Sequence, residues 1–373
     1  MEKIKEFVKN EIVLTVAVLL AVVSAFFVKP GDAYLEYIDY RVLVLLFCLM
    51  LVVAGMKSLG VFKRVGEKMC QHVTNTRQLA AVFVFLCFML SMLITNDVSL
   101  ITFVPFTISV FNMSGCAEFL VPVIVLETIA ANLGSMLTPI GNPQNLLLFS
   151  LSGMTAGSFI KYMLPLTLVS FLLIYLCFPF VKKKQLEQEK QDNQERMDKK
   201  KLGIYIILFF VCLGNVFHLY SYWIVLAVVT VTIAIIDKNL FREVDYSLLL
   251  TFIGFFIFIG NMKQIEVIHV FLTKLIVGNE FLTGVLLSQI ISNVPAAMLL
   301  SGFTTDYGDL LYGVNVGGLG TLIASMASLI SYRLYGKEFP EKKKTYFVQF
   351  TVYNVILLLI LCFMVIVVKP VCF

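Results

Sequence analysis

The chain alternates between long apolar stretches and short polar interruptions. The apolar stretches are about 20 residues long, which is enough for a helix to cross a hydrocarbon core about 30 Å thick. We therefore expect an all-α polytopic membrane protein. We expect the first span to be retained, because no small-residue cleavage site follows Val28. The clearest spans cover residues 12–28, 41–59, 159–181, 202–219, 222–236, 247–261 and 346–368.

Helix breakers and free amides interrupt one of the most apolar regions. Residues 131–149 read ANLGSMLTPIGNPQNLLLF, with two glycines, two prolines and four side-chain amides. Non-helical backbone at membrane depth costs several kcal/mol per unsatisfied group unless it is buried in protein or lines a wet cavity. The pattern therefore predicts a broken helix beside a polar centre.

The same order of features occurs twice. In the first half, LSMLITNDVSLITFVPF (residues 90–106) precedes the broken segment; in the second, LLSQIISNVPAAMLLSGF (286–303) precedes VNVGGLGTLIASMASLISY (314–332). Asn96 aligns with Asn293, and residues 132–135 align with 318–321. A repeat of about half the chain indicates a duplicated unit.

The duplication predicts a division of the chain into four parts. The first repeat covers residues 1–181, and the second covers 221–373. A charged cytoplasmic loop (182–201) and a linker helix (202–220) join them. We expect each repeat to hold a re-entrant hairpin and a broken helix, at 77–112 and 118–150 in the first and at 280–304 and 310–334 in the second.

Charge sets the orientation. With a cytoplasmic N-terminus and two re-entrant hairpins, most of the 29 Lys and Arg residues fall on the cytoplasmic side. This topology has about nine crossings plus two hairpins and leaves the C-terminus outside. The linker helix inverts the second repeat. Inverted repeats with broken helices that meet at mid-membrane are typical of secondary transporters.

Composition and the lack of catalytic motifs argue against a nucleic-acid-binding protein, a transition-metal protein and an enzyme. The chain is 59% hydrophobic and only 14% charged, and its net charge of +5 lies in short loops, so it indicates topology and not nucleic-acid binding. The 8 Cys and 3 His are scattered without ligand spacing, which predicts neither disulfides nor a transition-metal site. Because hydrolase, zincin, P-loop and dinucleotide motifs are missing, we expect a protein that is not an enzyme and needs no cofactor.

Oxygen donors at the breaks and hairpin tips form the candidate site. Carbonyls freed by a helix break can hold a cation, and helix N-termini can face an anion. Close helix packing is the alternative explanation, and it has most force for the glycines of residues 317–320. The expected cation-binding or coupling residues are Asn96, Asp97, Asn132, Gly134, Asn293, Gly318 and Gly320, with sodium as one possible ion. The expected substrate-binding residues are Thr95, Asn96, Pro139, Gly141, Asn142, Asn145, Ser292, Asn293 and Thr321.

Asp97 is the most informative single residue, because it is an acid at an expected hairpin tip. Acids inside a membrane are costly and usually face a functional cavity. Asp97 can hold a cation or carry a proton, or it can merely cap the helix that follows. Glu127 lies between apolar residues too, where it either joins the polar centre or pairs with a polar group of a neighbouring helix.

The segments TNDVSLITFVPF (95–106), ANLGSMLTPIGNPQNLLL (131–148), ISNVPAAML (291–299) and GVNVGGLGTLIASMASLI (313–330) together resemble the ion transporter superfamily. That superfamily groups divalent anion–sodium symporters, citrate–metal transporters, arsenite efflux permeases and one family of sodium–proton antiporters. The resemblance implies a homodimer with a scaffold and a moving transport part that works by an elevator-type motion.

The tips depart from the symporter pattern. Symporter tips carry Ser-Asn-Thr, whereas this chain has Thr95-Asn96-Asp97 and Ser292-Asn293-Val294. From the repeats, the breaks and the resemblance together, we predict a secondary active transporter in the inner or plasma membrane. It moves a small anion, a carboxylate or an oxyanion, coupled to sodium or protons. The alternatives are a sodium–proton antiporter or arsenite efflux permease that uses Asp97, and, from another class, a channel or structural membrane protein.

Overall fold

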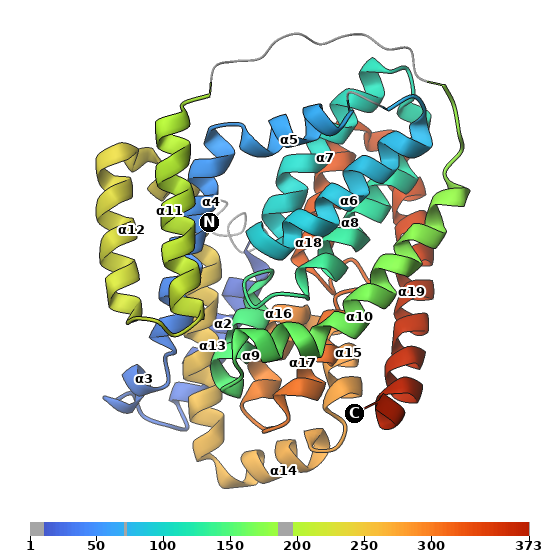
Figure 1. The fold of residues 1–373 in the computed structure, drawn as a ribbon. Coiled ribbons are helices and arrows are strands. Elements are labelled where there is room, and N and C mark those ends of the chain that lie inside the picture. The colour runs from blue at the N-terminus through green and yellow to red at the C-terminus, as the bar shows by residue number, and fades with distance from the viewer. Residues whose placement is uncertain (1–10, 71–72, 186–196, 373) are drawn as a thin grey trace.

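The computed structural model describes residues 11–70, 73–185 and 197–372, and in these residues the chain is built from helices (Figure 1). The helices of the first half are α2 (Ile12–Ala25), α3 (Ala33–Glu36), α4 (Tyr40–Ser58), α5 (Val61–Cys70), α6 (Thr76–Ile94), α7 (Asn96–Met113), α8 (Leu120–Ser135), α9 (Pro143–Ser152) and α10 (Ala156–Cys177). One isolated bridge, between Asn75 and Gln185, is the extended pairing found there.

The second half also consists of helices of different lengths. They are α11 (Lys199–Val216), α12 (Tyr222–Ile236), α13 (Tyr246–Gln264), α14 (Glu266–Ile276), α15 (Glu280–Ile291), α16 (Asn293–Ser301), α17 (Tyr307–Val316), α18 (Met326–Glu338) and α19 (Lys343–Cys372). Four short 3-10 turns, at 117–119, 178–180, 238–243 and 340–342, complete the described elements.

Many of these helices can cross a membrane. Within the described part of the chain, six are long and apolar enough, or up to seven if α14 and α15, which meet at 107°, form one broken span. The predicted all-α polytopic membrane protein is confirmed. The count of nine crossings stays a prediction: α2 and α12 are shorter than a full span and α11 is not among the six, whereas α6, which belongs to the first predicted hairpin, is.

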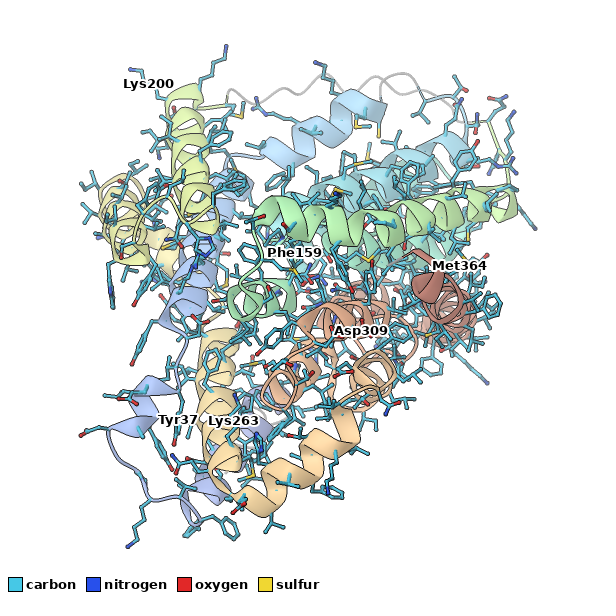
Figure 2. The ribbon with its side chains drawn as sticks, turned by 60° about the horizontal axis from the view of Figure 1, so that its bottom comes forward. Tyr37, Phe159, Lys200, Lys263, Asp309 and Met364 are labelled. Carbon is cyan, nitrogen blue, oxygen red and sulfur yellow. The ribbon has the colours of Figure 1, made fainter. Side chains whose placement is uncertain are left out.

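Two groups of helices stand side by side in Figure 1. Helices α4, α11 and α12 form one group, and α6, α7, α8, α18 and α19 form the other, with α5 running across the top of the view between them. Helices α2 and α13 pack against each other along their length. Figure 2 shows Tyr37 near the end of α13 that carries Lys263, and the Gln264 amide donates to the Tyr37 hydroxyl at 2.6 Å.

Two amphipathic helices were not expected from the apolar pattern. Helix α5 buries Phe62 and Gly66 against α7 while its lysines are exposed, and α14 buries only Ile276. Both helices come directly before a predicted hairpin. Such helices usually lie in the interface plane of a membrane.

The predicted segments fall on the following elements. Hairpin 77–112 corresponds to α6 and α7, and hairpin 280–304 corresponds to α15 and α16. Broken helix 118–150 corresponds to α8 and α9, and broken helix 310–334 to α17 and α18. The linker helix is α11. Residues 1–10 and most of the charged loop, 186–196, lie outside the described residues. The inverted repeats and the orientation of the chain in the membrane stay predictions.

Candidate functional site

Both hairpins turn through a strained residue. Thr95 joins α6 to α7 with φ 70° and ψ 150°, and Ser292 joins α15 to α16 with φ 78° and ψ 154°. This backbone region is essentially reserved for glycine and costs other residues about 1–3 kcal/mol. Two non-glycine residues therefore hold the same unfavourable conformation at matching places in the two halves.

Each tip is bound to the break of its own half. The N–H of Asn96 donates to the Gly141 carbonyl at 3.1 Å, and the N–H of Asn293 donates to the Ala324 carbonyl at 2.9 Å. We call residues 136–142 the first break and 317–325 the second break. The hydroxyl of Thr138 donates to the Met92 carbonyl, and that of Thr321 donates to the Gln289 carbonyl. These equivalent bonds align the two halves residue by residue.

Each break also binds the helix that precedes the break of the other half. The hydroxyl of Ser325, which precedes α18, donates to Oδ1 of Asn132 in α8 at 2.9 Å. In the reverse direction, Nδ2 of Asn142, which precedes α9, donates to Oδ1 of Asn315 in α17 at 3.1 Å. Asn315 therefore has the place in the second half that Asn132 has in the first. The sequence alignment gave that place to Gly318, which is a register error of the sequence comparison.

A continuous polar centre results. Nδ2 of Asn96 donates to Oδ1 of Asn132 at 3.1 Å, so Asn132 links the first tip to Ser325 of the second break. The neighbouring Ala324 holds the second tip through Asn293. The chain thus brings together both tips and both breaks, which belong to segments far apart in the sequence.

Two expected substrate-binding amides are already fully engaged. Nδ2 of Asn145 lies within hydrogen-bond distance of the carbonyls of Ser135, Met136 and Thr138, at 3.3, 3.1 and 3.0 Å, and its Oδ1 accepts from Asn315 at 2.7 Å. Oδ1 of Asn142 accepts from the Asn145 N–H at 2.8 Å. Both residues are buried. In this geometry Asn145 satisfies freed carbonyls, whereas Asn142 donates to the Ser135 hydroxyl and to Asn315, and both residues fix the shape of the first break.

The expected glycines allow close approach of backbone. A Cβ atom on Gly134 would lie 2.1 Å from the Phe88 carbonyl oxygen, and one on Gly141 would lie 2.0 Å from that of Ser135. A Cβ on Gly318 would meet Nδ2 of Asn293 at 3.0 Å. Gly320 has φ 104°, and its Cβ would lie 2.2 Å from Oε1 of Gln289. Pro139 is buried in the turn beside Gly141.

Thr95, Asp97 and Thr321 differ from these buried amides because they are partly or fully accessible. Oδ1 of Asp97 is buried without a hydrogen-bond partner. An acid with an unsatisfied buried oxygen inside a membrane protein can hold a cation or a proton.

Sequence reasoning left out three polar residues of this centre: Gln289, Asn315 and Ser325. Asn315 precedes Ser325 by the same number of residues as Asn132 precedes Asn142, so an exact comparison of the halves contained the signal. Glu127 lies apart from the tips. It accepts from the Thr107 hydroxyl, and its Oε2 is buried without a partner.

Comparison with known proteins agrees with this architecture. A family model described as citrate transporter matches residues 3–305. The chain belongs to the citrate transporter family. It is 35% identical over 327 residues to an uncharacterized transporter of Methanocaldococcus jannaschii, covering 86% of this chain and 87% of that protein. It is 34% identical over 327 residues to the inner membrane protein YbiR of Escherichia coli, covering 85% and 86%.

A shorter match is to the silicon efflux transporter LSI3 of Oryza sativa, 32% identical over 153 residues, which is 40% of this chain and 31% of that protein. The predicted superfamily is confirmed by the family match. The protein is an integral, multi-pass membrane protein of a transporter family, with an ion or small molecule as its substrate.

Proposed function

We propose that the protein is a secondary active transporter that moves a small anion, a carboxylate or an oxyanion, with a monovalent cation as the coupling ion. One observation carries the proposal: two strained hairpin tips bind two helix breaks, each of which binds the helix before the other break, through Asn132–Ser325 and Asn142–Asn315. Broken helices that meet in this way are where transporters bind substrates and coupling ions.

The coupling ion belongs beside Asp97 in this proposal. An anionic Asp97 would repel an anionic substrate, so a bound sodium ion or proton has to neutralise it before the substrate binds. Binding of the cation then promotes binding of the anion, and this reciprocal dependence is what couples the two fluxes. Thr95 and Ser292 supply hydroxyls to the solute, while Asn96 and Asn293 orient the tips; the Thr321 hydroxyl donates to the Gln289 carbonyl and shapes the second break.

We further propose that the tips and breaks move together as one transport part against a scaffold of α2, α4, α11, α12 and α13, in an elevator-type motion within a homodimer. The cross-bonds between the two halves support this, because they tie helices of both halves into one unit. The cytoplasmic N-terminus and the outer C-terminus belong to the same proposal.

Reconstitution into proteoliposomes tests the function. With an inward sodium or proton gradient, we expect saturable uptake of citrate or a dicarboxylate that stops when the gradient is collapsed. Asp97→Asn should abolish gradient-driven uptake while the protein remains folded and monodisperse. Asp32→Asn, which changes an exposed acid of an outer loop, should leave uptake unchanged. Equal uptake and equal ion dependence in parent and Asp97→Asn would remove Asp97 from the mechanism.

A second candidate is efflux of a small uncharged oxyacid, such as arsenite or silicic acid. The partial match to a silicon efflux transporter favours it, and so does Asp97, which does not repel an uncharged solute. A sodium–proton antiporter with Asp97 as the coupling group is a separate candidate, in which sodium itself is the transported solute. A thermal-stability screen with dicarboxylates, citrate, sulfate, arsenite, silicic acid, sodium and lithium separates these candidates.

A further inference from the structure

Glu127 is a buried acid that the proposed function does not use. It lies in the middle of α8 and is completely buried. Its Oε1 accepts from the Thr107 hydroxyl of α7, and its Oε2 has no hydrogen-bond partner among the described residues. The ion pairs that the described residues form with one another involve other acids. Within the described part of the chain, no cation therefore balances a charge on Glu127.

Helix α19, which packs against α8, brings a second group of this kind to the same place. Tyr346, in the first turn of α19, is completely buried, and its hydroxyl makes no hydrogen bond to a described residue. It lies near Glu127 and beside the hydroxyls of Thr128 and Ser331. Those two hydroxyls donate to carbonyls four residues earlier in their own helices, so their oxygens are free to accept. The Tyr346 O–H can donate to either, which leaves its own oxygen as an acceptor.

We propose that Glu127 is a proton-binding site, in which a neutral carboxyl group joins three helices. Its Oε1 accepts from Thr107 of α7, and its Oε2–H donates to the Tyr346 oxygen of α19. Each atom without a partner then supplies what the other lacks, as buried polar groups require. An ionised carboxylate would have only neutral hydroxyls around it, and buried charges need a paired ion or a metal.

This proton stays bound while the protein transports, so it differs from the coupling ion. The site lies apart from both hairpin tips, and its three helices are all elements that pack on one another. Its effect is to hold α7, the return helix of the first hairpin, and α19 on the broken helix α8. The inference does not depend on the proposed function.

The titratable groups around the site are neutral ones. They are the Cys87 thiol of α6, near Glu127, and Tyr335 of α18, whose ring stacks on that of Tyr346 at 5.1 Å. The buried residues of α7 and α10 carry no titratable side chain, and the buried Tyr312 of α17 stacks on a tyrosine of α10 instead. Thiols and phenols ordinarily keep their protons at neutral pH. Loss of the Glu127 proton is therefore the event that would place a charge here.

Glu127→Gln tests the proposal through the pH dependence of stability. The amide has nearly the shape of the neutral acid, accepts from Thr107 and donates to Tyr346. The folded parent keeps a proton that its unfolded chain releases above about pH 4.3, so the parent loses stability relative to the variant as the pH rises. Between about pH 5 and pH 8, the ratio of the folding equilibrium constants, variant over parent, should rise about tenfold per pH unit. Glu36→Gln, at an exposed glutamate, is the matched control, and its ratio should stay constant.

Infrared spectroscopy observes the proton in the folded protein. In heavy water near neutral pH, the parent should show the carbonyl band of a protonated carboxyl group, and Glu127→Gln should lack it. Tyr346→Phe removes the acceptor and should shift this band without abolishing it, which keeps the test decisive if Glu127→Gln does not fold. Because the proton stays bound, uptake by Glu127→Gln and its dependence on the ion gradient should equal those of the parent.

Four results would overturn the proposal. They are a parent without the protonated carboxyl band, a band that Tyr346→Phe leaves unshifted, parallel pH profiles of parent and Glu127→Gln, and loss of gradient-driven uptake in a folded Glu127→Gln. The last result would make Glu127 a coupling acid. The spectra and the unfolding curves need no substrate, so failure of the parent to transport any solute would reject the proposed function and leave this inference intact.

Discussion

At the scale of single residues, Thr95 and Ser292 carry the most specific information. Their backbone conformations match each other and suit glycine, yet the chain retains hydroxyl-bearing residues at both places. Strain of this kind persists when the surrounding structure holds it, and it concentrates at functional sites. Here the bonds from the Asn96 and Asn293 N–H groups to the breaks hold the strained conformation.

Replacing Thr95 or Ser292 with glycine should therefore raise the free energy of unfolding by about 1 kcal/mol, because relief of strain exceeds the entropy that glycine costs in the unfolded chain. The same variants should weaken ligand-dependent stabilisation. Thermal unfolding in detergent measures both effects. Thr102→Gly, inside the regular part of α7, is the control and should lose about 0.5 kcal/mol. A loss of stability in Thr95→Gly as large as in that control would contradict the strain argument.

Residue types predicted which residues form the polar centre better than they predicted what each side chain binds there. Prolines and amides inside an apolar run indicated a broken helix, and Asn96, Asn132 and Asn293 do lie at the contacts of tips and breaks. The sequence did not reveal that Asn145 is saturated by three carbonyls, because its partners become close only after the break has folded back. It also gave no sign that the Gln289 amide donates to the carbonyls of Gly317 and Leu319, since glutamine is common on helix surfaces.

At the scale of elements, a glycine sets how closely α8 approaches α6. Gly134 faces the Phe88 carbonyl, and its counterpart Gly317 in the second half faces the Ser288 hydroxyl. Small residues at such contacts let membrane helices pack backbone to backbone. The expectation of a cation-binding Gly134 stays untested, but its contacts account for a glycine without any ligand.

Gly134→Ala should lower the free energy of unfolding by about 3 kcal/mol, because the added methyl meets backbone and not a movable side chain. The matched control is Gly203→Ala in α11, where a Cβ meets nothing within 4 Å. That change should raise stability by about 0.5–1 kcal/mol. Denaturation by heat in detergent gives both values. Equal effects of the two substitutions would mean that α8 and α6 do not approach as described.

Sequence patterns were least informative for α5 and α14, the helices that precede the two hairpins. Lysines interrupt the apolar run in α5, and Glu266 and Lys274 do so in α14, so neither helix looked like a span. Both are amphipathic, and a pattern with a period of 3.6 residues contained that information. The alignment of the second break failed for another reason: glycine-rich segments align by composition, whereas hydrogen bonds identify Asn315 as the equivalent of Asn132.

At the scale of the whole molecule, the proposed scaffold and the proposed transport part meet at a polar contact on one side. Asp39, which caps α4, accepts from the Ser150 hydroxyl of α9 at 2.7 Å. Asp245 caps α13 in the same way and is followed by Tyr, as Asp39 is. Arg333 has the place in α18 that Ser150 has in α9. Asp245 and Arg333 are both exposed here, so the corresponding contact on the other side is open.

An elevator-type motion predicts that the two contacts alternate. Cysteines at Asp39 and Ser150 should cross-link with a short bifunctional thiol reagent in the state described here, and cysteines at Asp245 and Arg333 should cross-link only in the opposite state. Each cross-link should block transport, and reduction should restore it. Mass spectrometry of the cross-linked peptides measures the yield of each pair. Simultaneous, full cross-linking of both pairs in one molecule would exclude alternation.

The central claim is that both hairpin tips meet in a water-accessible centre inside the membrane. The most direct measurement is the reaction of Thr95→Cys and Ser292→Cys, in a background without other cysteines, with a water-soluble thiol reagent in sealed vesicles of both orientations. We expect Thr95→Cys to react in the state described here and Ser292→Cys, whose side chain is only 3% exposed here, to react when the protein samples the opposite state. Ligand should protect both, while Leu168→Cys, on an exposed apolar face of α10, stays inert. If both tip cysteines are as inert as Leu168→Cys, the tips face lipid and the account is wrong.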